Sequence, residues 1–165
     1  MTDPQLPPRG PVAAVATALA FAGGVLLMAT ALLSTASVAQ RYVTSQPIRG
    51  DFEIVSMGCG LAVLGFLAYG TLLRANILVD TFTNGLPRRA NQWLDALWTL
   101  VWAVCCLWLA ERMAVGALEA LRSGTTTIGL LGIPIWWAIG VGALCFAATA
   151  AAALYWVVRL ARGRA

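Results

Sequence analysis

The chain has 165 residues, of which 60% are hydrophobic and 11% charged, and its mean hydropathy is +0.80. Soluble domains are about half apolar and about a quarter charged, so the composition excludes an ordinary soluble protein and indicates an integral membrane protein. The net charge of +4 comes from arginine alone, and most of these arginines lie near the ends of apolar runs. This placement indicates orientation in a membrane rather than nucleic-acid binding.

Four apolar runs predict an all-α integral membrane fold with four transmembrane helices. The runs cover approximately residues 11–39, 53–73, 93–121 and 133–158. Each reaches the roughly 20 residues that a membrane-spanning helix needs, and backbone groups in hydrocarbon must pair within a helix. One transmembrane domain over residues 11–160 is predicted, with cytoplasmic tails at 1–10 and 161–165. Pro134 suits the first turn of the fourth helix, where its missing N–H costs nothing.

The first run could be a cleaved signal peptide, because Ser37-Val38-Ala39 resembles a small-residue cleavage site. The apolar region of a signal peptide is about 7–15 residues long, and residues 11–33 exceed that length. The run is therefore predicted to remain as the first membrane span.

Arginine placement predicts the orientation of the spans. One side of the membrane would hold more arginines (Arg9, Arg74, Arg88, Arg89, Arg159, Arg162 and Arg164) than the other (Arg41, Arg49 and Arg122). The richer side faces the cytoplasm by the positive-inside rule, so both termini are predicted to be cytoplasmic.

The segment RANILVDTFTNGLPRR, residues 74–89, lies between the second and third runs and is only half apolar. Its apolar residues recur at near-helical spacing, which predicts a short amphipathic segment in the cytoplasmic interface. Arg74 and the Arg88-Arg89 pair bracket it and suit anionic headgroups, while Asp80 needs a cationic or hydrogen-bonding partner. The alternative is a short loop with snorkelling arginines.

The loop before the second run carries Arg49, Asp51 and Glu53. The two acidic residues lie where the second helix begins and its N–H groups are unpaired, so helix capping is the simplest role for them.

The residues that most enzymes and carriers use are missing. The sequence has no histidine, and its four cysteines (Cys59, Cys105, Cys106 and Cys145) all lie inside apolar runs without a CxxC pair. No phosphate-binding loop, metal cluster or nucleophile–base arrangement is present, so the chain is predicted to be no enzyme and to bind no cofactor or metal.

Glu111 and Arg112 are adjacent charges inside the third run. Ionisable residues within a membrane are functional candidates, and pairing with another helix or subunit is one interpretation. The other is two interfacial residues near water, since they lie far from the cytoplasmic start of the run and are expected near the outer interface.

Small residues form possible packing faces in two of the runs. Gly58, Ala62, Gly65 and Ala68 share one face of the second helix, and Ala143, Ala147 and Ala151 share one face of the fourth. Such faces let transmembrane helices approach closely, within this chain or against a partner.

The order of four motifs resembles the small membrane subunit of tripartite ATP-independent periplasmic (TRAP) transporters. These are GDFE entering the second run, RANILVD leaving it, WLDAL opening the third and IPIWW opening the fourth. The likeness extends from about Val15 to Leu160. Many members of that family have histidine where this chain has Asn76.

The resemblance implies a bacterial inner-membrane importer of organic acids, driven by an ion gradient. A periplasmic solute-binding protein would deliver the acid to a large membrane subunit, and the small subunit would act as a scaffold and enlarge the docking surface. The candidate residues for subunit contact or lipid anchoring are then Arg49, Asp51, Glu53, Arg74, Asn76, Asp80, Arg88, Arg89, Glu111, Arg112, Pro134 and Trp136. The alternative is an autonomous four-helix exporter that works as a homodimer and uses an embedded carboxylate.

Overall fold

The computed structural model describes residues 10–74 and 88–161, and the described residues are almost entirely helical. Helix α1 covers Pro11–Thr44, α2 Asp51–Leu72, α3 Arg88–Ser123 and α4 Trp136–Ala161. Each is long and apolar enough to cross a membrane. The predicted all-α fold with four transmembrane helices is therefore confirmed, whereas the predicted amphipathic segment lies mainly in residues 75–87, outside the described residues.

The helix ends follow local sequence signals. Pro11 opens α1, whose C-cap Ser45 is left-handed at φ 57° and donates its N–H to the Arg41 carbonyl over 2.9 Å. Pro47 then prevents the helix from continuing. α1 extends five residues beyond its predicted end and α3 begins at Arg88, earlier than predicted, because polar residues prolong both helices past the apolar runs.

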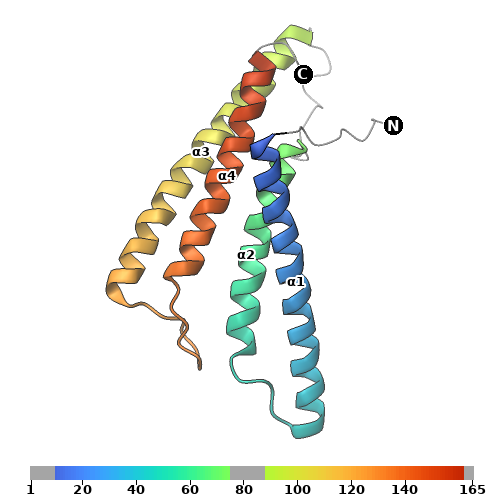
Figure 1. Ribbon diagram of the computed structural model, residues 1–165, viewed down its shortest axis with the longest axis vertical. Helices are drawn as coiled ribbons and strands as arrows, with labels where there is room; N and C mark the ends of the chain where they lie inside the picture. Colours follow the sequence, from blue (N-terminus) through green and yellow to red (C-terminus); the bar gives the residue numbers. More distant parts are fainter. Residues whose placement is uncertain (1–9, 75–87, 162–165) are drawn as a thin grey trace.

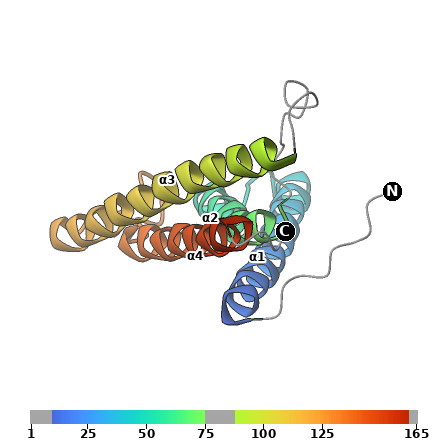
Figure 2. The ribbon, with the colours of Figure 1, turned by 90° about the horizontal axis from the view of Figure 1, so that it is seen from above.

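Two antiparallel helical hairpins make up the bundle. α1 packs along α2, α3 packs along α4, and the hairpins meet mainly through α2 and α4. Figure 1 shows the hairpins converging where α1 begins and α4 ends, and diverging toward the loops 45–50 and 124–135. We call the end where α1 begins and α4 ends the terminal end. The opposite end, which carries the loops 45–50 and 124–135, is the loop end. Seen from above in Figure 2, α3 lies at the edge of the bundle beside α4.

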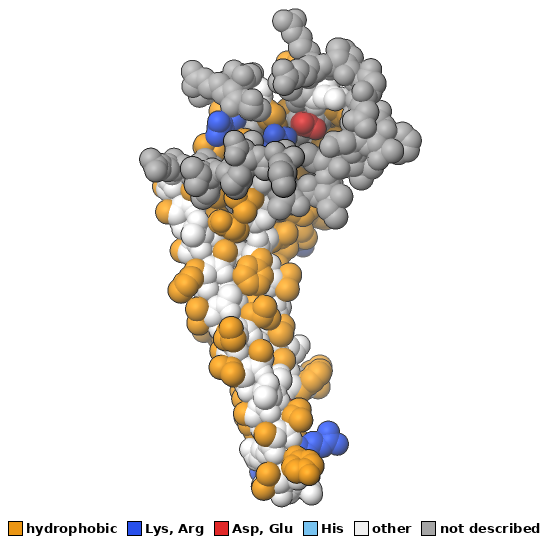
Figure 3. Space-filling view, turned by 90° about the vertical axis from the view of Figure 1, so that its right-hand side faces the viewer, with side chains coloured by type: hydrophobic (Ala, Val, Ile, Leu, Met, Phe, Trp, Pro, Cys, Tyr) orange, Lys and Arg blue, Asp and Glu red, His pale blue; other side chains and the backbone are white. Residues whose placement is uncertain are grey.

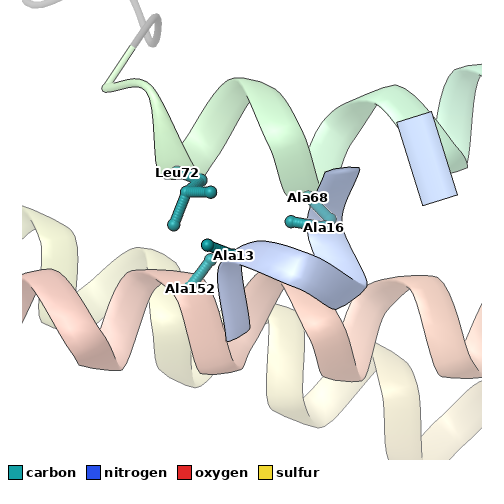
Figure 4. Packing of buried hydrophobic residues seen from close by; sticks show 5 residues of the cluster. All are labelled: Ala13, Ala16, Ala68, Leu72 and Ala152. Carbon is teal, nitrogen blue, oxygen red and sulfur yellow. The ribbon is translucent and has the colours of Figure 1, made fainter. Parts of the chain in front are cut away.

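Small residues fill the helix contacts. The cluster in Figure 4 joins Ala13 and Ala16 of α1, Ala68 and Leu72 of α2, and Ala152 of α4. Large apolar side chains point outward instead, and Figure 3 shows them along the length of the face it displays. This distribution suits hydrocarbon surroundings, where close backbone approach drives association and exposed apolar groups cost nothing.

The predicted packing face of α2 is confirmed, since Gly58, Ala62, Gly65 and Ala68 are all buried. A Cβ on Gly65 would lie 2.7 Å from the Leu19 carbonyl oxygen, so α1 and α2 are in backbone contact here. The predicted face of α4 does not pack within the described part of the chain, since Ala143 is buried but Ala147 and Ala151 are exposed, and its use against a partner stays a prediction. α4 packs against both α2 and α3, and its buried residues therefore occupy two other stripes, which include Cys145, Thr149, Ala152 and Ala153.

Candidate interaction surfaces

Glu53 is the central polar group of the loop end. It lies in the first turn of α2 and is buried, with 8% of its surface exposed. Its carboxylate accepts hydrogen bonds from the Thr127 hydroxyl and, over 3.1 Å, from the Leu131 backbone N–H. Both donors belong to the loop between α3 and α4. Glu53 therefore does more than cap its own helix, because it holds the loop of one hairpin against the start of the other.

Two glycines make this contact sterically feasible. A Cβ on Gly129 would collide with the Glu53 carboxyl group. Gly50, just before α2, is left-handed at φ 78°, and a Cβ there would collide with the Leu131 side chain. The close approach at Gly129 and the positive φ at Gly50 both require residues without a Cβ.

Asp51 joins α2 to α1, whereas Glu53 joins α2 to the loop that follows α3. Its carboxylate accepts hydrogen bonds from the Ser37 hydroxyl of α1 and from the Phe52 N–H over 2.6 Å. The Ser37 oxygen in turn accepts the Ile48 N–H over 3.3 Å. Arg49 lies beside this group but is exposed, and within the described residues it pairs with neither Asp51 nor Glu53.

The loop 124–135 ends in an apolar tip. Thr126 and Pro134 pair as an isolated antiparallel bridge, and the Thr127 N–H donates to the Ile133 carbonyl over 2.9 Å. Between these residues, Ile128 is fully exposed and Leu130 is 80% exposed. Pro134 thus belongs to this loop and not, as predicted, to the first turn of α4, which begins at Trp136 with that residue 42% exposed.

A second polar group lies at the terminal end, around Trp156. The Trp156 indole N–H donates to the Leu72 carbonyl over 2.8 Å, and this bond caps α2 with a side chain of α4. The guanidinium groups of Arg74 and Arg159 lie 5.3 and 5.1 Å from the centre of its ring, within cation–π range. Arg74 also pairs with Asp95 of α3 at 3.5 Å, so it contacts both α3 and α4.

Arg74 is held in an unusual backbone conformation. It is left-handed at φ 53°, directly after the last turn of α2. This turn aims its side chain back at α3 and α4. Arg74 was a predicted site residue, but Asp95, Trp156 and Arg159 were not. The signals available for them were a carboxylate near the start of the third run and an aromatic residue near a cluster of arginines.

Four other predicted residues follow Arg74 in the chain, and only two of them belong to the described residues. Asn76 and Asp80 lie outside the described residues. Arg88 and Arg89 form the first turn of α3 and so belong to a helix rather than to a connecting loop.

Glu111 and Arg112 lie deeper than predicted. The adjoining residue Met113 approaches Gly142 of α4 and Leu64 of α2, since a Cβ on Gly142 would lie 3.6 Å from the Met113 sulfur and 3.1 Å from Leu64 Cδ1. Leu64 is in the central part of α2. Measured against α2, the two charges therefore do not lie at its outer end. α3 reaches beyond α2 at the terminal end (Figure 1), so the distance of the two residues from the start of α3 overstates how close they lie to the loop end.

Four long apolar helices with polar groups gathered mainly at their two ends define a multi-pass helical membrane protein. The model of the family described as the DctQ component of tripartite ATP-independent periplasmic transporters matches residues 30–163. The chain belongs to this family, and it is thus a small component of a TRAP transporter. Neither the curated proteins nor the solved structures give a significant match.

Proposed function

We propose that this chain is a non-catalytic scaffold subunit of a TRAP-type importer of organic acids. It holds the large membrane subunit and helps the periplasmic solute-binding protein to dock. The observation that carries this proposal is the composition of the bundle interior. Among the described residues Glu53 is the only buried charged residue, and its hydrogen bonds are used to hold a loop.

The buried hydroxyl groups support the same conclusion. Thr30 and Thr149 donate to carbonyls one turn back in their own helices, and Thr71 accepts from the Trp102 indole over 3.3 Å. Each is satisfied by a structural bond. A transport site needs polar groups or broken helices near the middle of the membrane, whereas the described helix contacts here consist mainly of alanine, glycine and cysteine.

The proposed orientation places the terminal end in the cytoplasm. Arg74, Arg88, Arg89 and Arg159 lie at that end, against Arg41, Arg49 and Arg122 at the loop end. Arg74 and Arg159 around Trp156 also form the arginine–aromatic combination that is typical of a membrane interface. The loop end is then periplasmic.

The periplasmic loop end offers a surface for docking a protein. Tyr42, Phe52, Ile128 and Leu130 are each at least 80% exposed there, and Arg49 lies among them. Exposed aromatic and aliphatic groups beside arginine are typical of protein contact sites. Glu53 fixes the loop that carries two of them, so the docking surface is held in place before the partner arrives.

The direct test is co-purification. The chain, tagged at its C-terminus, is extracted from native bacterial membranes in mild detergent, and its partners are identified by mass spectrometry. A large polytopic membrane protein in near-equal amount is expected. Recovery of the chain alone, or only as a self-pair, would count against the scaffold role.

Asp80 provides a test of the segment between α2 and α3. If its carboxylate contacts the large subunit, Asp80→Ala reduces co-purification of that subunit. Substrate uptake by cells that carry the variant falls in parallel. Unchanged recovery and uptake would remove Asp80 from the interface.

One observation favours the exporter alternative, namely the carboxylate of Glu111 at the depth of Leu64. An exporter needs such a group, and Glu111→Gln would then abolish transport by the purified chain in liposomes. The scaffold role predicts no transport by the wild-type chain alone. Transport by the wild-type chain that is lost in the variant would replace our proposal.

A further inference from the structure

Glu111 and Arg112 lie at a depth where ionised side chains are costly in lipid. Their neighbour Met113 approaches Leu64, which lies roughly 20 Å from the start of α2 and roughly 12 Å from its end. The 22 residues of α2 extend about 33 Å, just enough to cross about 30 Å of hydrocarbon. Leu64 is therefore inside the hydrocarbon, and both charges lie within about one helical turn of its depth.

The two charges flank the side of α3 that faces away from the bundle. Among the described helices α3 packs only against α4, through a stripe that includes Ala103, Cys106 and Ala110. At about 100° per residue, the direction midway between Glu111 and Arg112 points roughly opposite to this stripe. Figure 2 shows α3 at the edge of the bundle, so this direction is open within the described part of the chain.

Apolar residues occupy the strip between the two charges. Trp108 and Val115 are exposed and lie within about 10° of the midline, whereas Glu111 and Arg112 lie about 50° to either side of it. We call this surface the charged face of α3 and define it by Val104, Trp108, Glu111, Arg112 and Val115. It has one acidic edge, one basic edge and an apolar centre.

Neither charge is neutralised by the described part of the chain. No ion pair or hydrogen bond joins Glu111 or Arg112 to any residue in 10–74 or 88–161. The end of α3 at Ser123 is roughly 16 Å further along the axis, beyond the reach of a snorkelling side chain. Ionised groups at such a depth normally face a protein partner or water rather than lipid.

We propose that the charged face of α3 is the contact between two copies of this chain, in which Glu111 of each copy pairs with Arg112 of the other. Two copies in one membrane share the same orientation, so a symmetric pair has its twofold axis along the membrane normal. This axis places the acidic edge of one copy against the basic edge of the other, twice. The paired residues differ in height by only about 1.5 Å, the rise of one residue.

Charge complementarity selects a second copy as the occupant of this face. The copy supplies both missing counter-charges at the right depth, and its apolar strip meets the same strip across the axis. A different helix would need its own acid and base at this depth and in the opposite order. The inference goes beyond the scaffold role, because it gives the assembled transporter two copies of this chain.

The test uses two copies of the chain with different tags, co-expressed with the other transporter components in bacterial membranes. One tag is captured, and the amount of the other tag is measured. Wild-type copies are expected to co-purify. Glu111→Arg in both copies places arginines against each other, and Arg112→Glu in both copies does the same with carboxylates. Either change is expected to reduce recovery of the second copy at least about tenfold.

The decisive sample combines the two variants. A copy with Glu111→Arg, captured in the presence of a copy with Arg112→Glu, again has opposite charges on the facing edges, so recovery returns to near the wild-type level. A defect in folding or insertion would persist in this mixture. Absence of co-purification between wild-type copies, undiminished recovery in either single variant, or failure of the mixture to recover would each overturn the inference.

The same samples separate this inference from the proposed function. The large subunit is measured in every eluate. If it co-purifies but no second copy does, the scaffold role stands and the self-pair fails. If the second copy follows the charge pattern and the large subunit is absent throughout, the self-pair stands and the scaffold role fails. A variant pair that loses the large subunit and is not restored by mixing would assign the charged face to the large subunit.

Cysteine crosslinking locates the axis independently. The exposed native cysteine on α3 is first removed by Cys105→Ala. In that background Val115→Cys lies close to the midline, and oxidation in native membranes is expected to give a disulfide-linked dimer. Leu107→Cys, also at an exposed position but about 90° from the midline, is the matched control and should give little dimer. Crosslinking at Leu107→Cys without crosslinking at Val115→Cys would place the contact on another side of α3 and overturn the inference.

Discussion

Individual residues at the loop end show how a single carboxylate organises the outer part of the bundle. Glu53 binds two donors from a loop that follows it by more than 70 positions in the chain. Asp51, two residues earlier, binds Ser37 of α1 instead. The two acids look equivalent in sequence, but at about 100° per residue they point to nearly opposite sides of the first turn of α2 and so meet different hairpins. Glu53 therefore links the hairpins, and Asp51 stabilises only the first.

Glu53→Gln is expected to lower the midpoint of thermal unfolding in detergent. The amide supplies only one acceptor oxygen and turns an N–H₂ group toward the donors, so one bond to Thr127 or Leu131 is lost. Thermal unfolding followed by circular dichroism measures the effect. Glu119→Gln serves as the control and should leave the midpoint unchanged. Equal midpoints for the two variants would mean that the Glu53 contact contributes nothing.

Gly129→Ala tests the same contact from the loop side. The added methyl group would overlap the Glu53 carboxyl group, so the loop must move away from α2. Greater accessibility of the loop to added protease in detergent is expected. Ile128→Ala, which alters a fully exposed neighbour, is the matched control and should behave as the wild type. Wild-type resistance of Gly129→Ala would contradict the close approach.

The helices differ in how they achieve their contacts. α1 and α2 meet backbone to backbone, since a Cβ on Gly23 would lie 2.9 Å from the Ala62 carbonyl oxygen. α4 lies between α2 and α3 and uses alanine and cysteine on two sides. α3 relies on α4 for its packing and leaves its other side open.

Gly65→Ala is expected to destabilise the α1–α2 hairpin by roughly 1–3 kcal/mol, because the new methyl group has backbone on its far side and the helices must separate. Gly60→Ala, on an open side of the same helix, has no atom within 4 Å of the added Cβ and is the matched control. Reversible unfolding of both variants in mixed micelles compares their free energies. Similar values would argue against close packing at Gly65.

Ala147→Leu addresses the exposed side of α4. Because Ala147 is exposed, the larger side chain should leave the folding of the isolated chain unchanged. Thermal unfolding of the purified variant checks this expectation. A large loss of stability would indicate that Ala147 is packed inside the chain after all.

At the scale of the whole molecule, the bundle has two polar ends and a long apolar body. The terminal end collects Arg74, Asp95, Trp156 and Arg159, and the loop end collects Glu53, Asp51 and an apolar tip. In the proposed scaffold role, the two polar ends are the parts that would meet partners at the two membrane surfaces.

The proposed orientation can be tested with epitope tags at the C-terminus and within the exposed loop after Gln46. The positive-inside rule predicts that protease added to spheroplasts removes the loop tag and spares the C-terminal tag. Inverted vesicles should give the reverse pattern. Cleavage of the C-terminal tag in spheroplasts would reverse the assignment of the two ends.

The sequence by itself determined the four membrane-spanning helices, their approximate limits and the packing face of α2, because hydrophobic length and small-residue spacing act locally along one helix. The order of four short motifs was also enough to identify the family. Tertiary structure alone decided the partners of Glu53 and Arg74, the exposure of Ala147 and the depth of Glu111 and Arg112. These properties depend on which helices lie side by side and at what height. The pattern along one helix does not contain this information, because many helix pairings bury the same small residues equally well.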